Sequence, residues 1–409
     1  MKHLEPIRIF TAFIFTIIFI ACDEPDSKPL ERFAGDIVNV THIHEYSPEE
    51  ASQVLQNMGL AEIGSIPYSI LAKKITYMSP DHNQELIELS GALIYPVDNE
   101  SHPLLSIQHG TVTKRTAVAS ENPLNSSAGM TALYTASQGY ITLVPDYAGF
   151  GESYDIHPYM HAESLANSVI DLIRAAKVYC LDQGIELQDQ LYLTGYSEGG
   201  YATLATQRKI ESDLSDEFSL TAIAPMAGPY DLSGTARLIM RNDSYDWPAY
   251  IGFMFVAYEE IYGLDNLSVV FDSPYDLQIA DFYNGEYDFF EINNQLPQSI
   301  SEMISSDFLE SFNNGTEIEY SSVFEENNLL DWEPVTPTRF YHGMADSTVP
   351  YTIAEATVAN LSENGAGVVE LVGIPDANHA TAGLPAILAM MDWFSTYHVN
   401  SSNLGYQIN

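Results

Sequence analysis

From residue 73 onward, short β-rich runs alternate with longer helical patterns, and this alternation constrains the fold more than any other feature of the sequence. Strands that are joined by helices form a parallel sheet covered on both faces. The predicted strands are 73–79, 86–95, 104–109, 140–145, 190–196, 220–226, 338–342 and 367–374. The predicted helices are 128–138, 161–183, 198–212, 350–364 and 380–397. The sequence therefore predicts an α/β fold with an eight-stranded, mostly parallel sheet.

The alternation stops between residues 230 and 335. Within 245–290, 14 of 46 residues are aromatic, against 11% in the whole chain. We expect residues 230–335 to form an inserted cap or lid, with residues 36–229 and 336–409 as the core domain. Many of these aromatic side chains would fill the core of the insertion itself, and others would line a ligand crevice at the carboxyl ends of the strands.

The N-terminal segment has the pattern of an export signal. Lys2 and Arg8 precede an apolar run from Ile9 to Ile20, and Cys22 follows directly. Residues 1–22 are thus predicted to be a lipoprotein signal peptide, with Cys22 as the lipidated residue and 23–35 as a polar tether. The alternatives are an ordinary signal peptide and an uncleaved helix that is too short to span a membrane comfortably. We expect the protein to be exported and to be anchored to a membrane as a lipoprotein, in the periplasm or at the cell surface.

Charge and cysteine content exclude several classes of function. The chain carries 15 Lys and Arg against 56 Asp and Glu, a net charge of −41, so it would repel the phosphates of nucleic acids. Cys22 and Cys180 are the two cysteines, and with Cys22 acylated neither an intrachain disulfide nor a cysteine zinc site is possible. Cys180 is predicted to be buried on an apolar helical stripe.

A nucleophile motif follows the run at 190–194. Gly195-Tyr196-Ser197-Glu198-Gly199-Gly200 matches G-x-S-x-G, and it stands between a predicted strand and a predicted helix, as that motif requires. The turn exposes the serine hydroxyl, and the close crossing of strand and helix leaves no room for side chains at the two flanking glycines. Ser197 is the candidate nucleophile.

A serine nucleophile needs a base, and the base needs an orienting acid, expected in the chain order Ser, acid, His. Asp346 and His379 each follow a predicted strand, so their loops meet Ser197 at one edge of the sheet. Asp376 is the rival acid, but it lies only three residues from His379 in the same loop. His109, His342 and His398 are the other histidines considered. The first two are expected to fix loops and the third to lie on the surface.

The oxyanion of a tetrahedral intermediate needs two preorganised donors. We expect the N–H groups of Glu198 and Thr111, with Gly110 allowing the turn before Thr111. A loop without a catalytic donor is the alternative for His109-Gly110-Thr111. The glycine-rich segment 145–153 lacks the order of a phosphate-binding loop, so it is predicted to be a rigid turn near the pocket.

Taken together, these motifs resemble the α/β-hydrolase superfamily, and within it the secretory lipase family typified by fungal lipase A. The similar segments are Gln108 to Thr111, Asp146 to Ser153, Gly195 to Gly200, His342 to Pro350, and Asn378-His379. The resemblance implies ester hydrolysis without a cofactor or metal, a helical cap after the sixth strand, and a catalytic triad of Ser197, Asp346 and His379. The chain differs from the fungal members in its lack of disulfides and its bacterial type of lipid anchor.

The expected function is a membrane-tethered serine esterase or lipase that acts on an apolar acyl or aromatic ester, either a small molecule or a lipid. A serine peptidase of the prolyl-oligopeptidase kind would share the fold and triad, but the chain has no propeller-sized N-terminal domain. A hydrolase-fold protein that only binds its ligand is the third hypothesis.

Overall fold

The computed structural model describes residues 31–60 and 66–397. The predicted signal peptide, Cys22, residues 23–30 of the predicted tether and His398 lie outside these residues. Among the described residues, no helix has both the length and the apolar character to cross a membrane.

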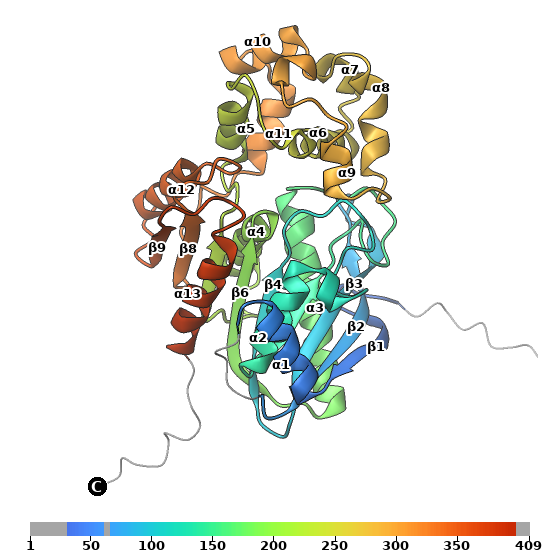
Figure 1. Ribbon diagram of the computed structural model, residues 1–409, viewed down its shortest axis with the longest axis vertical. Coiled ribbons are helices and arrows are strands. Elements are labelled where there is room, and N and C mark those ends of the chain that lie inside the picture. Colours follow the sequence, from blue (N-terminus) through green and yellow to red (C-terminus); the bar gives the residue numbers. More distant parts are fainter. Residues whose placement is uncertain (1–30, 61–65, 398–409) are drawn as a thin grey trace, which may run out of the picture. The chain divides into compact units, whose positions relative to one another are not determined.

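Nine strands form one sheet (Figure 1), in the order β1-β2-β3-β5-β4-β6-β7-β8-β9. β1, β2, β3 and β5 pair antiparallel, and all pairs from β5 through β4 to β9 are parallel. The strands are β1 (Ile37–Tyr46), β2 (Ser69–Pro80), β3 (Leu86–Val97), β4 (His102–Gln108), β5 (Ile141–Pro145), β6 (Leu187–Tyr196), β7 (Ala222–Met226), β8 (Thr338–Gly343) and β9 (Val369–Ile374). The mostly parallel α/β fold is confirmed.

The prediction of eight strands was wrong by one, because β1 was missed. β1 pairs only with β2 and is largely exposed, so its polar residues do not alternate with a buried apolar set. Helix α1 (Pro48–Asn57), which follows, also escaped the analysis. It buries only Ala51 and Leu55, although Ser47 and Glu50 form a capping box that is readable in sequence.

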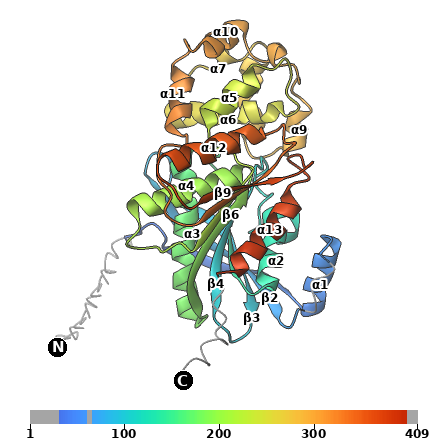
Figure 2. The same cartoon turned by 90° about the vertical axis from the view of Figure 1, so that its left-hand side faces the viewer.

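Helices cover both faces of the sheet (Figure 2). α3 (Ala162–Gln183), α4 (Glu198–Asp213) and α12 (Tyr351–Glu363) contribute to one apolar cluster. α1, α2 (Ser127–Ser137) and α13 (Gly383–Ser395) contribute to the other, on the opposite face. Cys180 is buried on α3, as its place on the apolar stripe predicts.

The segment between β7 and β8 is helical and lies beyond the carboxyl ends of the strands (Figure 1). It contains α5 (Leu232–Met240), α6 (Pro248–Tyr262), α7 (Leu267–Val270), α8 (Tyr275–Gln278), α9 (Phe289–Asn293), α10 (Ser306–Asn314) and α11 (Glu319–Glu326). Phe255 of α6 is buried among Phe271, Phe308, Tyr320 and Phe324, each packed edge-to-face against it. The aromatic enrichment of the sequence thus builds a core within the segment.

Candidate active site

A sharp turn between β6 and α4 presents Ser197. Its φ of 60° and ψ of −121° are strained for a residue with a side chain, and its N–H donates to the Met226 carbonyl. A Cβ on Gly195 would lie 2.3 Å from the Gly199 carbonyl oxygen, and one on Gly199 would lie 2.0 Å from the Gln108 carbonyl oxygen. The turn therefore requires glycine at both positions, which gives the motif its physical reason.

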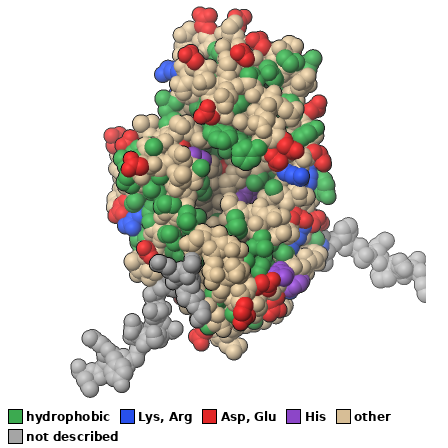
Figure 3. Space-filling view, in the orientation of Figure 1, with side chains coloured by type: hydrophobic (Ala, Val, Ile, Leu, Met, Phe, Trp, Pro, Cys, Tyr) green, Lys and Arg blue, Asp and Glu red, His purple; other side chains and the backbone are tan. Residues whose placement is uncertain are grey.

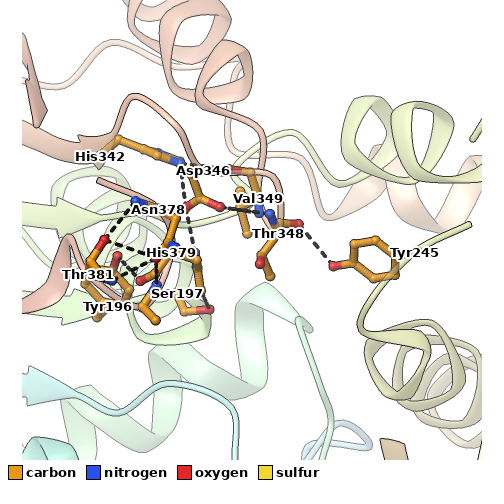
Figure 4. A network of polar contacts seen from close by, with 11 residues as sticks. Tyr196, Ser197, Tyr245, His342, Asp346, Thr348, Val349, Asn378, His379 and Thr381 are labelled. Atoms are coloured by element: carbon orange, nitrogen blue, oxygen red, sulfur yellow. Dashed lines mark hydrogen bonds and ion pairs between the residues drawn. The ribbon is translucent and has the colours of Figure 1, made fainter. Parts of the chain in front are cut away.

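His379 lies between Ser197 and Asp346 (Figure 4). Its Nε2 is 3.0 Å from the Ser197 Oγ, and its Nδ1 is 2.6 Å from the Asp346 Oδ2. The three residues come from the loops that follow β6, β8 and β9. An aspartate that accepts from Nδ1 leaves Nε2 free to accept a proton from the serine. This arrangement can activate a hydroxyl nucleophile.

The surroundings of Asp346 keep its carboxylate ionised. Burial by itself would raise the pKa of Asp346, but hydrogen bonds from His342 and His379 and the charges of those rings outweigh burial and lower it to about 2. The other oxygen, Oδ1, accepts the N–H groups of Thr348 at 2.9 Å and Val349 at 3.0 Å. Asp346 is thus held as a carboxylate with a fixed orientation.

The alternative candidates for the acid and the base lie elsewhere or make other contacts. Asp376 is exposed, and His379 bonds to Asp346. His109 bridges the carbonyls of Gly110 and Asp146. His342 is fully buried, and its Nε2 lies 2.8 Å from the Val349 carbonyl and 3.2 Å from the Asp346 Oδ2. His109 and His342 therefore do fix loops, and His342 also contacts the acid.

Two tyrosines orient the loops that carry this arrangement. The Tyr196 hydroxyl donates to the His379 carbonyl at 2.7 Å. The Tyr245 hydroxyl reaches from the segment between α5 and α6 to the Thr348 carbonyl at 3.0 Å, as Figure 4 shows. The helical segment is therefore tied to the loop of Asp346.

The loop of Thr111 lies directly against the serine. A Cβ on Gly110 would lie 3.0 Å from the Tyr196 carbonyl oxygen and 3.6 Å from the Ser197 Cβ. On the other side, Glu198 opens α4, so its N–H is one of the amides without a partner inside the helix. Glu198 and Gly110, the residue before Thr111, thus both lie beside Ser197.

Side chains that the sequence analysis missed hold these two donors. The Tyr159 hydroxyl lies 3.0 Å from the Thr111 Oγ1. His157 Nε2 lies 2.6 Å from the Glu198 Oε1, with both side chains buried, and its Nδ1 contacts the Ala148 carbonyl at 2.8 Å. His157 and Tyr159 belong to the loop after β5, whose position at the carboxyl end of a parallel strand was the available signal.

The first part of that same loop is fixed by Asp146. Its buried carboxylate accepts from the hydroxyls of Ser90 at 2.6 Å and of Ser120. Burial raises the pKa of Asp146, against the lowering effect of those two hydrogen bonds. The interpretation of segment 145–153 as a rigid turn agrees with these contacts.

Two cavities include residues of this site in their linings. The first encloses about 660 Å³ of empty space, part of it open to solvent, and contains Ser197 in its lining. Its walls are largely apolar and come mainly from the helical segment: Leu232, Ala236, Ile239, Met240, Tyr245, Tyr250, Ile251, Met254, Phe255 and Phe324. The second holds about 1170 Å³, also partly open, and contains His379 and Gly110 in its lining.

Within the described part of the chain, no group of three or more His, Cys, Asp or Glu side chains is arranged to hold a metal ion.

Comparison with protein families gives a match to secretory lipases over residues 122–243, a stretch that includes Ser197. No curated protein matches the sequence. The chain resembles the secretory lipase family, as the motifs imply.

Solved structures are similar over nearly the whole chain. A putative hydrolase from Legionella pneumophila is 26% identical with a TM-score of 0.83, covering 91% of this chain and 100% of its own. The rice cell wall degrading esterase LipA from Xanthomonas oryzae is 26% identical with a TM-score of 0.79, covering 90% and 100%. Candida antarctica lipase A is 15% identical with a TM-score of 0.65, covering 90% of this chain and 84% of its own, and this likeness shows the fold alone. The fold is that of the α/β-hydrolases.

Proposed function

We propose that this chain, a carboxylic ester hydrolase of the α/β-hydrolase fold, cleaves its substrate through an acyl-enzyme on Ser197. The observation that carries the proposal is the position of the His379 ring, within hydrogen-bond reach of both Ser197 and Asp346. The match to secretory lipases and the similarity to esterase structures support the reaction class.

In the first half of the reaction, His379 Nε2 takes the proton of the Ser197 hydroxyl while Oγ attacks the ester carbonyl. Asp346 holds the imidazole in the tautomer that carries its proton on Nδ1 and stabilises the imidazolium that forms. His379 then gives the proton to the departing alkoxide. In the second half, His379 activates a water molecule that attacks the acyl-enzyme and releases the acid.

The oxyanion of each tetrahedral intermediate is bound by the N–H groups of Glu198 and Thr111. Such donors act because they are in place before charge develops on the oxygen. The contacts of His157 with the Glu198 side chain and of Tyr159 with the Thr111 side chain support this preorganisation.

Residues 230–335 act as a cap that binds the acyl group in the first cavity. The apolar wall above Ser197 suits an aliphatic or aromatic acyl group, and no Lys, Arg, Asp or Glu is among its lining residues. Arg115 fastens this cap to the core by donating to the carbonyls of Gly149, Ser153 and Asn284. We infer that these hydrogen bonds hold the cap in place, so that next to Arg115 it forms a fixed wall of the pocket.

Secretory lipases are exported proteins, and export of this chain agrees with the apolar segment near its N-terminus. The finer proposal is that Cys22 is lipidated and that the enzyme stays attached to a membrane through residues 23–35. A Cys22→Ser chain expressed in bacteria would then move from the membrane fraction to the soluble fraction. Retention of the Cys22→Ser protein in the membrane fraction would contradict the anchor.

The test of the activity is burst kinetics on the purified chain without residues 1–30, the predicted signal peptide and most of the predicted tether. p-Nitrophenyl esters of increasing acyl length are compared with a proline-peptide anilide, and Ser197→Ala serves as the inactive control. A burst of p-nitrophenol that Ser197→Ala abolishes supports the esterase. Cleavage of the anilide without ester turnover would support a peptidase, and ligand binding without either turnover would support a binding protein.

A further inference from the structure

The second cavity is a groove between α2 and α13 that ends at the catalytic residues. Its lining runs from Ser127, Ala128, Met130 and Thr131 of α2 across the ends of β4 and β6 to Gly383, Leu384, Ile387 and Met390 of α13. Figure 3 shows a hollow on this side of the molecule, below the helices α5–α11. The groove is therefore partly open to solvent, and none of its lining residues in the described part of the chain lines the first cavity.

The two cavities differ in which residue of the candidate triad lines them. Ser197 lines the first cavity, and His379 does not. His379 and Gly110 line the groove, and Ser197 does not. The lining of the first cavity thus includes the candidate nucleophile, and the lining of the groove includes the candidate base.

This division matches what ester cleavage requires of the two halves of a substrate. The acyl carbon forms its bond to Ser197 Oγ and must stay with the serine. The ester oxygen of the alcohol loses its bond to carbon and takes a proton from His379 Nε2, so it must lie within about 3 Å of that nitrogen. The alcohol half therefore leaves on the side of the imidazole, where the groove begins.

We propose that the groove between α2 and α13 is the binding site for the alcohol half of the ester, and that this alcohol is apolar. The proposal rests on the proposed function and adds to it a binding site for the second half of the ester. The acyl half and the alcohol half of the substrate are called its acyl arm and its alcohol arm. The chain then selects esters with an apolar group on each side of the carboxyl, with the acyl arm under the cap and the alcohol arm along α13.

The chemistry of the groove supports an apolar occupant. Its side chains include Ile107, Leu384 and Ile387, and four methionines: Met58, Met130, Met226 and Met390. Among the residues that the structure describes, its lining contains no Lys, Arg, Asp or Glu, and its titratable side chains are His109, His379 and Tyr196. Methionine side chains are flexible and polarisable, so they adapt to alkyl and aryl groups of different shapes. An alcohol carrying a phosphate or a carboxylate would find no Lys or Arg among these residues to neutralise its charge.

The test uses two leucines on α13 that are both exposed. Leu384 is 41% exposed and lines the groove, whereas Leu388 is 37% exposed and does not. Leu384→Trp narrows the groove, and Leu388→Trp is the matched control for placing a tryptophan on this helix. Each variant is assayed with methyl butyrate and hexyl butyrate, which share the acyl group, and with methyl octanoate, which lengthens the acyl arm.

For the wild type, kcat/KM is expected to be higher for hexyl butyrate than for methyl butyrate. Leu384→Trp is expected to lower this hexyl-to-methyl ratio about tenfold, the discrimination that one or two methylenes give in an apolar pocket, and Leu388→Trp to leave it unchanged. Ile239→Trp, in the first cavity, should instead lower the ratio of methyl octanoate to methyl butyrate.

Three results would overturn the inference while leaving the proposed function intact. They are a wild-type preference for the methyl ester, an unchanged hexyl-to-methyl ratio in Leu384→Trp, and an equal fall in Leu388→Trp. Hydrolysis that persists in Ser197→Ala would instead overturn the proposed function. The two failures are therefore distinguishable within one set of assays.

Discussion

Replacing Asp346 by asparagine changes one atom at the centre of the site, and its consequence follows from the contacts of each oxygen. Oδ1 accepts the N–H groups of Thr348 and Val349, so in the variant the amide oxygen keeps that place. The amide nitrogen then occupies the position of Oδ2, 2.6 Å from His379 Nδ1 and 3.2 Å from His342 Nε2. A group that accepted hydrogen bonds becomes one that donates them.

His379 must then accept at Nδ1, and its proton moves to Nε2, which faces Ser197. An imidazole in that tautomer has no lone pair with which to take the serine proton. The same carboxylate-to-amide exchange in a serine protease triad lowers kcat about 10⁴-fold, and we expect a loss of that size here. By transition-state arithmetic it corresponds to about 5 kcal/mol of activation free energy.

The assay is the steady-state kcat for p-nitrophenyl butyrate at pH 7.5, chosen well above the pKa of Asp346, with thermal unfolding as the check on folding. Asp376→Asn is the matched control, because Asp376 is an exposed aspartate in the loop of His379. We expect its kcat to stay within about twofold of the wild type. An Asp346→Asn enzyme within tenfold of the wild type, or an equal loss in Asp376→Asn, would refute the tautomer argument.

Three further changes test other parts of the site. Because the pKa of Asp346 is lowered to about 2, its ionisation stabilises the fold above about pH 4, and this contribution is lost as the pH falls through 2. Urea unfolding should therefore show that the wild type loses about 2 kcal/mol more stability between pH 5 and 2 than Asp346→Asn does. Parallel curves of unfolding free energy against pH for the two proteins would contradict this prediction. Tyr159→Phe removes the contact with the Thr111 hydroxyl, which is worth about 1 kcal/mol. We expect kcat to fall about fivefold, with KM and the melting temperature nearly unchanged. An unchanged kcat would count against a role of Tyr159 in positioning Thr111. Gly199→Ala places a methyl group 2.0 Å from the Gln108 carbonyl oxygen and should lower the free energy of unfolding by at least about 2 kcal/mol; an unchanged melting temperature would show that the turn has room.

The central part of the sheet was predictable because its strands contain runs of apolar residues that are buried. β5 and β7, for example, are buried along their whole length, and a continuous apolar run next to a helical pattern leaves little choice of structure. β1 carries His42, His44 and Glu45 on a largely exposed edge, so neither periodicity nor apolar content marks it as a strand. Edge strands are defined by pairing with a neighbour, which a local pattern does not reveal.

At the candidate site, the residues that stand in sequence motifs could be named from the sequence, and those that only contact them could not. Ser197, Asp346 and His379 were named because a strand-end loop and a known chain order limit where such residues stand. His157 pairs with Glu198, 41 positions away, through a loop without regular periodicity. Tyr245 reaches Thr348 across 103 positions. Such contacts depend on tertiary packing, which local sequence patterns do not encode.

The central claim is that the ester's acyl group passes through Ser197, and trapping that intermediate tests it most directly. Enzyme mixed with p-nitrophenyl octanoate is quenched in acid within the burst, digested and analysed by mass spectrometry. The account predicts an octanoyl group on the peptide that contains Ser197 and none on Ser197→Ala. Ester turnover with an unmodified Ser197 peptide, or with the acyl group on another residue, would contradict it.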